Sequence, residues 1–317
     1  MILEPFDKIV SLISESLNKP EDQMRMMLII FLAFPIGYAY RFIGGKNKRH
    51  TYSILLGAFL HVFMFRWEVF HFWGLALAVY IIMATFSRKN QAWVVFFVAM
   101  THLSGMHIKR VLFDYGGWSM DATTFLMPLV SRISSLGFVY ADGAKAQKDK
   151  SETSKESGNI ELSDEQKSRM VVKKPTLVEI LSYVSFPAAN ICGPFFEFRD
   201  YIDFIEEKNR YKNIPNSNRQ TLNKFLMGIL FLSTYVILPQ FFDANSINTK
   251  EYFAKPYCQQ YIYFYIALFG LRATYYSVWY FNEGAMTWAG LSYNGTGEKG
   301  EPKFDRIKCV DAIAVET

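Results

Sequence analysis

Hydrophobic residues in this chain gather into long stretches that are separated by short charged runs. A helix needs about twenty apolar residues to cross a bilayer, and about eight stretches approach that length. They are Met26–Ile43, Tyr52–Phe65, Val69–Phe86, Ala92–Ile108, Met120–Gly143, Thr176–Ile191, Phe225–Phe242 and Gln259–Phe281. Aromatic residues make up 17% of the chain, more than is usual in soluble domains. The pattern predicts an all-α polytopic membrane protein with about eight hydrophobic helices.

A charged segment divides this apolar pattern. Residues 144–175 are rich in Lys, Glu and Ser, a composition typical of solvated, flexible loops. We therefore expect N-terminal transmembrane helices over residues 1–143, a charged flexible loop over 144–175, and further transmembrane and interfacial helices with a polar C-terminal loop over 176–317. In the last part, the segment 196–213 alternates apolar and charged residues at roughly helical spacing, which favours a helix on the membrane surface.

The distribution of charge constrains topology and partners. The net charge is +5, but the basic residues lie in loops beside apolar stretches, so we expect no nucleic-acid partner. The loops Gly44–His50 and Ser87–Asn90 are both basic, which favours a cytosolic position for them and a lumenal N-terminus. The N-terminal segment lacks a continuous apolar core and a cleavage site, so no cleaved signal peptide is expected. The three cysteines are far apart and indicate neither a disulfide framework nor a metal site.

Ionisable residues inside apolar stretches are costly in a bilayer and usually face a partner or a watery cavity. Those that stand out are Asp121, Arg132, Asp142, Arg272 and Glu283. The spacing of the first three is about three helical turns each way, so one face of a helix can hold them, and we expect that face to point into the protein. Two interpretations of Arg132 stay open: it serves a substrate path, or it snorkels or pairs with a neighbouring span. For Asp121 we favour a helix cap.

Histidines and polar loops are weaker candidates. His102 and His107 lie on different faces of a helix, whereas shared metal ligands usually lie three or four residues apart, so we interpret both as interfacial or bundle-facing. The Gly193–Pro194 pair either forms a simple turn or breaks a helix and frees backbone groups. Glu283 and Asn294 follow the most aromatic stretch and fit a polar cavity mouth or a loop equally well.

Three blocks carry a resemblance. They are MDATTFLMPLVSRISSLGFVYADG at 120–143, KPTLVEILSYVSFPAANICGPFFEFRDYIDFI at 174–205, and EGAMTWAGLSYNG at 283–295 followed by GEPKFDRIKCVD at 300–311. In order and spacing they resemble the membrane-bound O-acyltransferase family, and within it the lysophospholipid acyltransferase branch, from about Arg41 onward. Ser292 departs from the glycine that is common in the branch.

The resemblance implies a multi-pass enzyme of the endoplasmic reticulum membrane that takes part in phospholipid remodelling. It would transfer a fatty acyl group from acyl-CoA, its co-substrate, to a lysophospholipid hydroxyl, with no cofactor and with membrane lipids around it. Family members enclose a tunnel, which implies tunnel or substrate-path roles for Arg132, Asp142, Glu283 and Asn294. Arg132 and Asp142, which both lie in the block 120–143, would order the walls of the tunnel or the phosphate-bearing head groups of its ligands.

One feature of the family has no counterpart here. The catalytic Asn and His of the branch lie C-terminal to the block that PKFDRIKCVD resembles, and the last of the five histidines in this chain is His107. We therefore expect no catalytic residue in this chain and only a partial bundle of the family fold, either as a fragment of a longer enzyme or as a truncated product. Two alternatives stay open: a non-catalytic membrane scaffold or lipid-binding protein, and a transporter, since intramembrane charges also mark solute pathways.

Overall fold

The computed structural model describes residues 3–117, 119–151, 162–189 and 193–316; its elements there are helices, with one isolated β-bridge between Thr296 and Pro302. This agrees with the all-α class predicted from the sequence. The α-helices are α1 (Glu4–Leu17), α2 (Glu21–Ala39), α3 (Lys46–Phe65), α4 (Val69–Thr85), α5 (Gln91–Phe113), α6 (Ala122–Ser151), α7 (Asp164–Arg169), α8 (Leu177–Val184), α9 (Phe198–Ile205), α10 (Asn218–Ile237), α11 (Lys250–Phe253), α12 (Tyr257–Ala289) and α13 (Ala312–Glu316).

Fewer membrane spans emerge than the sequence predicted. In the described part of the chain, 4 helical stretches are long and apolar enough to cross a membrane, instead of about eight: Glu21–Phe42, Lys46–Thr85, Ala122–Gln147 and Asn218–Gln240. The second of these joins two predicted spans across the short turn at 66–68. Helices α5 and α12 are long enough, with 23 and 33 residues, but they carry more polar side chains.

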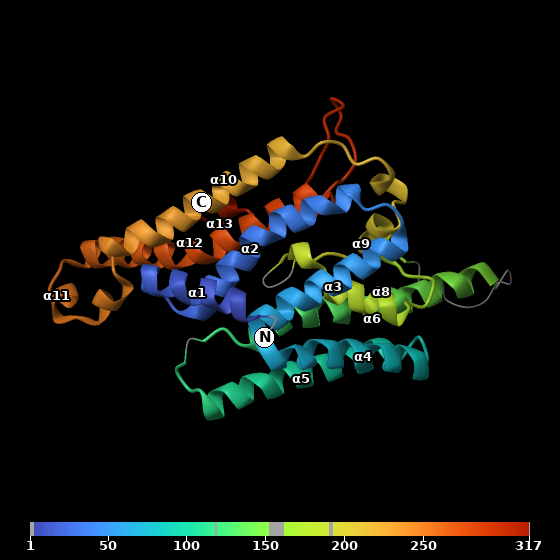
Figure 1. The fold of residues 1–317 in the computed structure, drawn as a ribbon, viewed down its shortest axis with the longest axis horizontal. Helices are drawn as coiled ribbons and strands as arrows, with labels where there is room; N and C mark the ends of the chain where they lie inside the picture. The colour runs from blue at the N-terminus through green and yellow to red at the C-terminus, as the bar shows by residue number, and fades with distance from the viewer. Residues whose placement is uncertain (1–2, 118, 152–161, 190–192, 317) are drawn as a thin grey trace.

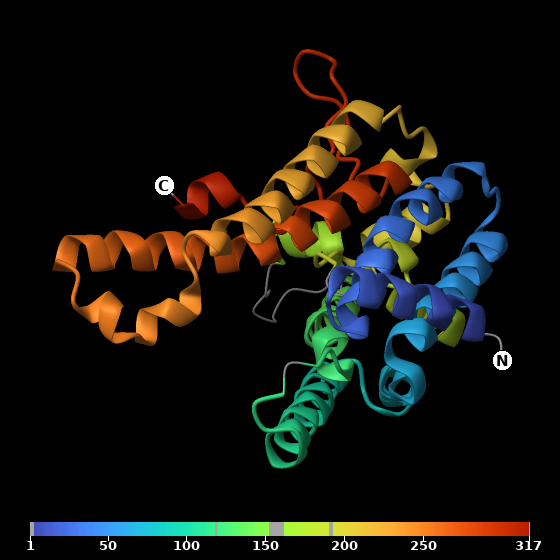
Figure 2. The same cartoon turned by 60° about the vertical axis from the view of Figure 1, so that its left-hand side comes forward.

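Two groups of helices build the molecule. Helix α10 packs along α12 and α12 along α2, whereas α5 packs along α6, and α4 contacts α6 and α8. Figure 1 shows the first group along the upper side of the molecule, with α4 and α5 along the lower edge; the turned view of Figure 2 separates the same groups. The main hydrophobic core contains side chains from α3, α4, α6, α8 and α9, among them Leu60, Phe72, Phe125, Tyr183 and Phe204.

The described residues of the charged segment include two helical parts. Helix α6 continues to Ser151, a capping box at Ser163 starts α7, and residues 152–161 of the segment lie outside the described residues. Residues 170–175, which we name the strap, run over α6, where the Val171 N–H donates to the Val139 carbonyl at 2.9 Å. The flexibility that the sequence predicts for 144–175 stays a prediction.

The predicted span Thr176–Ile191 is wrong in the part that the structure describes. Helix α8 has 8 residues, which at about 1.5 Å per residue cannot cross a bilayer. It begins with a capping box between Thr176 and Glu179, and the chain then forms a 3-10 turn at Pro187–Ala189. The apolar residues of this segment are buried within the protein, with Ile180, Tyr183 and Phe186 at 0% exposure, so protein neighbours take the place that lipid had in the prediction.

The amphipathic segment 196–213 forms the short helix α9 instead of a long surface helix. Its apolar face, which includes Tyr201 and Phe204, is buried in the main core. Helix α9 contacts α3, α7 and α8. The segment does not cross a membrane, as predicted, but its apolar side is covered by protein.

The two basic loops lie at one end of the bundle. Lys46 at the start of α3 is 3.5 Å from Glu206, which follows α9, and Arg88 donates to the Val172 carbonyl of the strap. At the other end, α1 approaches the turn between α3 and α4 through the Asp7–Arg66 ion pair. The cytosolic position of both basic loops stays a prediction.

Candidate functional site

Arg132 is the most unusual ionisable residue of the bundle. It lies in the middle of α6 and is 1% exposed. None of its three guanidinium nitrogens has a hydrogen-bond partner among the described residues. Its Cζ atom lies 5.2 Å from the ring centre of Phe196, 5.5 Å from that of Phe125 and 5.9 Å from that of Tyr183. Arg132 therefore neither snorkels to the surface nor pairs with a neighbouring span, the two structural interpretations that the sequence left open.

Arg49 shows how a buried arginine is normally satisfied. It is 4% exposed, and it donates to the carbonyls of Ile43, Phe204 and Tyr40 at 2.7, 2.8 and 3.0 Å. It also donates to the Glu207 carboxylate at 2.8 Å. A charge removed from water costs several kcal/mol unless such partners compensate, and around Arg132 the described neighbours are aromatic faces, each of which contributes about 2 kcal/mol to a desolvated cation.

Asp121 and Asp142, which the sequence placed on the same face of α6, have their own partners. The Asp121 carboxylate accepts from the Thr123 N–H at 3.0 Å directly before the first turn of α6, as a helix cap does. The Asp142 carboxylate accepts from Lys145 at 2.8 Å and from Gln166 of α7 at 3.4 Å. Asp142 therefore lies within α6, links that helix to α7 and, in the part of the chain that the structure describes, forms no ion pair with Arg132.

Glu283 and Asn294 hold the segment that follows α12. Glu283 is 2% exposed, accepts from Lys224 of α10 at 2.7 Å, and accepts the backbone N–H of Cys309. Asn294 donates to Asp305 at 2.9 Å and accepts from Arg210 at 3.0 Å. The structure thus brings neither residue to Arg132; each fastens the polar C-terminal segment to a different neighbour.

Two buried carboxylates at the start of α9 were missed in the sequence. Glu197 accepts from Arg169 and from Ser135, each at 3.2 Å. Asp200 accepts from Arg306 at 2.6 Å and lies 3.5 Å from Arg210. Both lie at 5–7% exposure, and the alternation of aromatic and charged residues in FEFRDY was the signal that could have identified them.

The remaining ionisable candidates also have neighbours. Arg272 of α12 forms a two-pronged contact with Glu316, at 2.8 and 2.7 Å. The His102 ring lies 5.2 Å from that of His71. In the described residues, no group of three or more His, Cys, Asp or Glu side chains is placed to hold a metal ion.

A buried hydroxyl network crosses the core near α8 and was not foreseen. The Tyr40 and Ser53 hydroxyls lie 2.6 Å apart, and Tyr201 donates to Ser53 at 3.0 Å. The His50 Nδ1 atom lies 2.7 Å from the Ser182 hydroxyl. These bonds join the 3-10 turn at Tyr40–Phe42 and the helices α3, α8 and α9 to one another.

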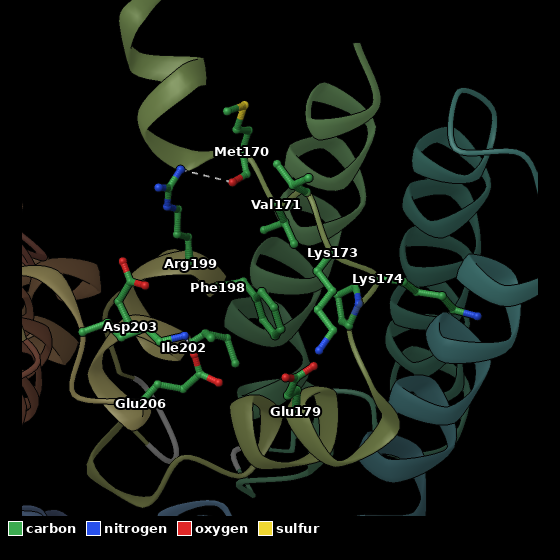
Figure 3. A pocket seen from close by; sticks show the side chains of 13 residues that line it. Met170, Val171, Lys173, Lys174, Glu179, Phe198, Arg199, Ile202, Asp203 and Glu206 are labelled. Carbon is green, nitrogen blue, oxygen red and sulfur yellow. Dashed lines mark hydrogen bonds and ion pairs between the residues drawn. The ribbon is translucent and has the colours of Figure 1, made fainter. Parts of the chain in front are cut away.

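A cavity of about 360 Å³ opens at the end of the bundle that carries the basic loops. The strap, α8 and α9 form its walls. Figure 3 shows Lys173 reaching toward Glu179 across this cavity, with Arg199 on the opposite wall and Lys174 pointing away. Lys174 instead lies 5.4 Å from the ring centre of Tyr80. Basic side chains, among them Lys173 and Arg199, line the cavity together with Phe198 and with the carboxylates of Glu179, Asp203 and Glu206.

A second, apolar cavity of about 140 Å³ lies between α2, α10 and α12. Its walls include Met26, Ile30, Leu232 and Phe281. Because Gln23 at the start of α2 also lines it, it lies toward the end of α2 opposite to Lys46. The molecule therefore offers a charged cavity and an apolar one, the two environments that an amphiphilic ligand requires.

Comparison with known proteins adds to this geometry. The model of the membrane-bound O-acyltransferase family, MBOAT, matches residues 118–317. Membrane-bound glycerophospholipid O-acyltransferase 1 of Mus musculus is 26% identical over 327 residues, with 96% of this chain and 64% of that protein covered. The lysophospholipid acyltransferase of Schizosaccharomyces pombe is 25% identical, with 96% and 59% covered. Lysophospholipid acyltransferase 2 of Arabidopsis thaliana is 27% identical, with 92% and 62% covered. The chain spans about three fifths of the length of these relatives.

Proposed function

The chain belongs to the membrane-bound O-acyltransferase family, and from this we propose that it acts in the transfer of a fatty acyl group from acyl-CoA to a free hydroxyl of a lysophospholipid. The observation that carries the proposal is the likeness, along nearly the whole chain, to proteins named as lysophospholipid or glycerophospholipid O-acyltransferases. Phospholipid remodelling in the endoplasmic reticulum membrane is part of the same proposal. The charged and apolar cavities support it, because both substrates are amphiphiles.

The proposed reaction transfers the acyl group from the sulfur of CoA to a hydroxyl oxygen of the lysophospholipid. The lysolipid hydroxyl oxygen attacks the thioester carbonyl carbon, so a C–O bond forms and the C–S bond breaks. The hydroxyl proton leaves to a general base, and the CoA sulfur is released as a thiolate that takes up a proton. A general base contributes about 10²–10⁴-fold to such a step. We assign this role to no histidine of the chain, since the resemblance places the catalytic Asn and His C-terminal to residues 300–311.

We propose that the 360 Å³ cavity receives phosphate groups of acyl-CoA. Lys173 faces the cavity in Figure 3, and lysine is a common phosphate ligand in proteins. Both predicted cytosolic loops reach this end of the bundle through Lys46 and Arg88. A ligand that arrives from the cytosol would meet this cavity first.

The variants Lys173→Glu and Lys174→Glu form a matched pair for this donor site. They introduce the same charge change in adjacent residues that both line the cavity, but in Figure 3 the side chain of Lys173 points into it and that of Lys174 points away, toward Tyr80. We expect Lys173→Glu to raise the KM for acyl-CoA about fivefold or more with little change in kcat, and Lys174→Glu to leave it near the wild-type value. Equal effects of the two variants would reject the cavity as the donor site.

The activity itself is tested by product identity. Membranes that contain the protein as its gene encodes it are incubated with acyl-CoA labelled in the acyl chain and with one lysophospholipid at a time. We expect the label in the matching diacyl phospholipid. Absence of labelled phospholipid with every lysophospholipid, at normal protein abundance, would reject the proposed transfer and favour a scaffold or transport role.

A further inference from the structure

Arg132 carries a charge that the protein does not use internally. Its guanidinium is 1% exposed and has no hydrogen-bond partner in the part of the chain that the structure describes. An isolated ion in such a place destabilises the fold. A residue that is costly to the folded protein and makes no internal bond is well suited to bind an anion that the protein does not itself contain.

The two buried carboxylates at the start of α9 are already paired with other cations. Glu197, next to Phe196, accepts from Arg169 and Ser135, and Asp200 is held by Arg306 and Arg210. Each of these two carboxylates therefore has its own positive partner. In the described part of the chain, neither carboxylate forms a hydrogen bond with the guanidinium of Arg132.

We infer that the Arg132 guanidinium binds the phosphodiester of the lysophospholipid acceptor, an inference that rests on the proposed function. A guanidinium presents donors in a fork that matches two phosphate oxygens. A phosphodiester carries a single negative charge, so one arginine neutralises it and the pair becomes tolerable in an apolar core. CoA is also a source of phosphate, but it carries several negative charges, and among the described residues around Phe125, Tyr183 and Phe196 the one cation without a hydrogen-bond partner is Arg132.

Three aromatic rings surround the Arg132 guanidinium. Phe125 and Phe196 cover it with their rings, and both are buried in the main core. Tyr183 is fixed on the remaining side, because its hydroxyl donates to the Phe196 carbonyl at 2.7 Å. A phosphate that binds the guanidinium must therefore displace the ring of Phe125 or Phe196, and neither ring has a hydrogen bond to break when it turns.

The test compares Arg132→Met with Arg49→Met in the purified full-length protein in detergent. The unfolding temperature is measured alone and with 1-oleoyl lysophosphatidylcholine, with 1-oleoylglycerol, which has no phosphate, and with CoA. Without ligand, we expect Arg132→Met to unfold at or above the wild-type temperature, because the variant removes an unpaired buried charge. Arg49→Met should unfold at a lower temperature, because it removes four internal hydrogen bonds.

With ligand, the inference predicts a selective loss. Arg132→Met should require about 10–100-fold more lysophosphatidylcholine for the same stabilisation, the range expected for a charge-assisted bond. Its responses to 1-oleoylglycerol and to CoA should match those of the wild-type protein. Should Arg132→Met fail to fold, Arg132→Lys keeps the charge without the fork and is expected to lose about tenfold in lysophosphatidylcholine affinity.

Three results would overturn the inference. They are an unchanged lysophosphatidylcholine response in the Arg132 variants, an equal loss with 1-oleoylglycerol, and a loss confined to CoA, which would assign the arginine to the donor. Failure of the proposed function is distinguishable: a protein that transfers no acyl group but shows an Arg132-dependent response to lysophosphatidylcholine rejects the reaction and keeps the binding site.

Discussion

Gly57 of α3 lies where two parts of the backbone nearly touch. A Cβ atom at this position would collide with the carbonyl oxygen of Ser185, directly after α8. Backbone cannot turn aside as a side chain can, so Gly57→Ala should push α3 away from α8. We expect the free energy of unfolding to fall by roughly 1–3 kcal/mol, measured by unfolding in detergent.

Gly74 of α4 provides the matched control. It also lies inside a helix, but a Cβ atom there would meet nothing within 4 Å. Gly74→Ala should therefore be neutral or stabilise by up to about 1 kcal/mol. A similar loss of stability in both variants would contradict the close approach of α3 and α8.

Sequence reasoning located Arg132 but not its environment. The helical spacing of charges in the segment 120–143 correctly predicted that Arg132 faces the protein interior, because a helix repeats its faces every few residues. Whether the charge finds a partner depends on the side chains that other segments bring to it. Glu197 and Asp200 lie more than sixty residues away in sequence, and their pairing with other cations appears only in the folded structure.

Among the elements, the junction between α3 and α9 includes one carboxylate with a lowered pKa. Glu206 follows α9, accepts from Lys208 at 2.5 Å and lies 3.5 Å from Lys46. The hydrogen bond from Lys208 holds the pKa of Glu206 below its ordinary value, with Lys46 acting in the same direction. A carboxyl with a lower pKa in the folded state contributes stability above its unfolded pKa and loses it as the pH falls through the folded value.

Because the pKa of Glu206 is lowered in the folded state, we expect the contact between α3 and the residues after α9 to lose stability in acid. Between about pH 5 and pH 3, the wild-type unfolding temperature should fall more than that of Glu206→Gln, which carries no titratable group at this position. At pH 7 the variant should be slightly less stable than the wild-type protein. Parallel pH profiles for the two proteins would show that the junction contributes no pH-dependent stability.

The element that sequence reasoning judged least well is α8. The run Thr176–Ile191 has the composition of a span, but burial in lipid and burial in protein select the same apolar side chains. The capping box at Thr176 and the turn at Pro187 were the local signals of a short helix. In contrast, α2 and α10 were predicted well, because their apolar runs extend over most of the helix.

The whole molecule has two chemically different ends, and its orientation can be tested. We expect the loop before α3 to face the cytosol and the loop after α5 to face the lumen. In a cysteine-free background in sealed microsomes, Lys48→Cys should react with an impermeant maleimide added outside. Tyr115→Cys, at a position that is 88% exposed, should react only after the membrane is opened. The reverse pattern would invert the topology.

Fold class and family could be predicted from the sequence, but the number of spans and the cavities could not. The fold class follows from apolar composition and the family from the three blocks of residues, and both features can be read along the chain without knowledge of the folded structure. The 360 Å³ cavity is built from the strap, α8 and α9, and its shape depends on contacts such as that of Arg88 with the strap. Such contacts join residues that a linear pattern does not connect.

The central claim, acyl transfer to a lysophospholipid, is tested most directly by the balance of its two products. Free CoA thiol and diacyl phospholipid are measured together in membranes that contain the protein as its gene encodes it, with and without lysophospholipid. We predict that both products appear at equal rates, and only when the lysophospholipid is present. Release of thiol without formation of diacyl phospholipid, or formation of neither product by an abundant and folded protein, would contradict the account.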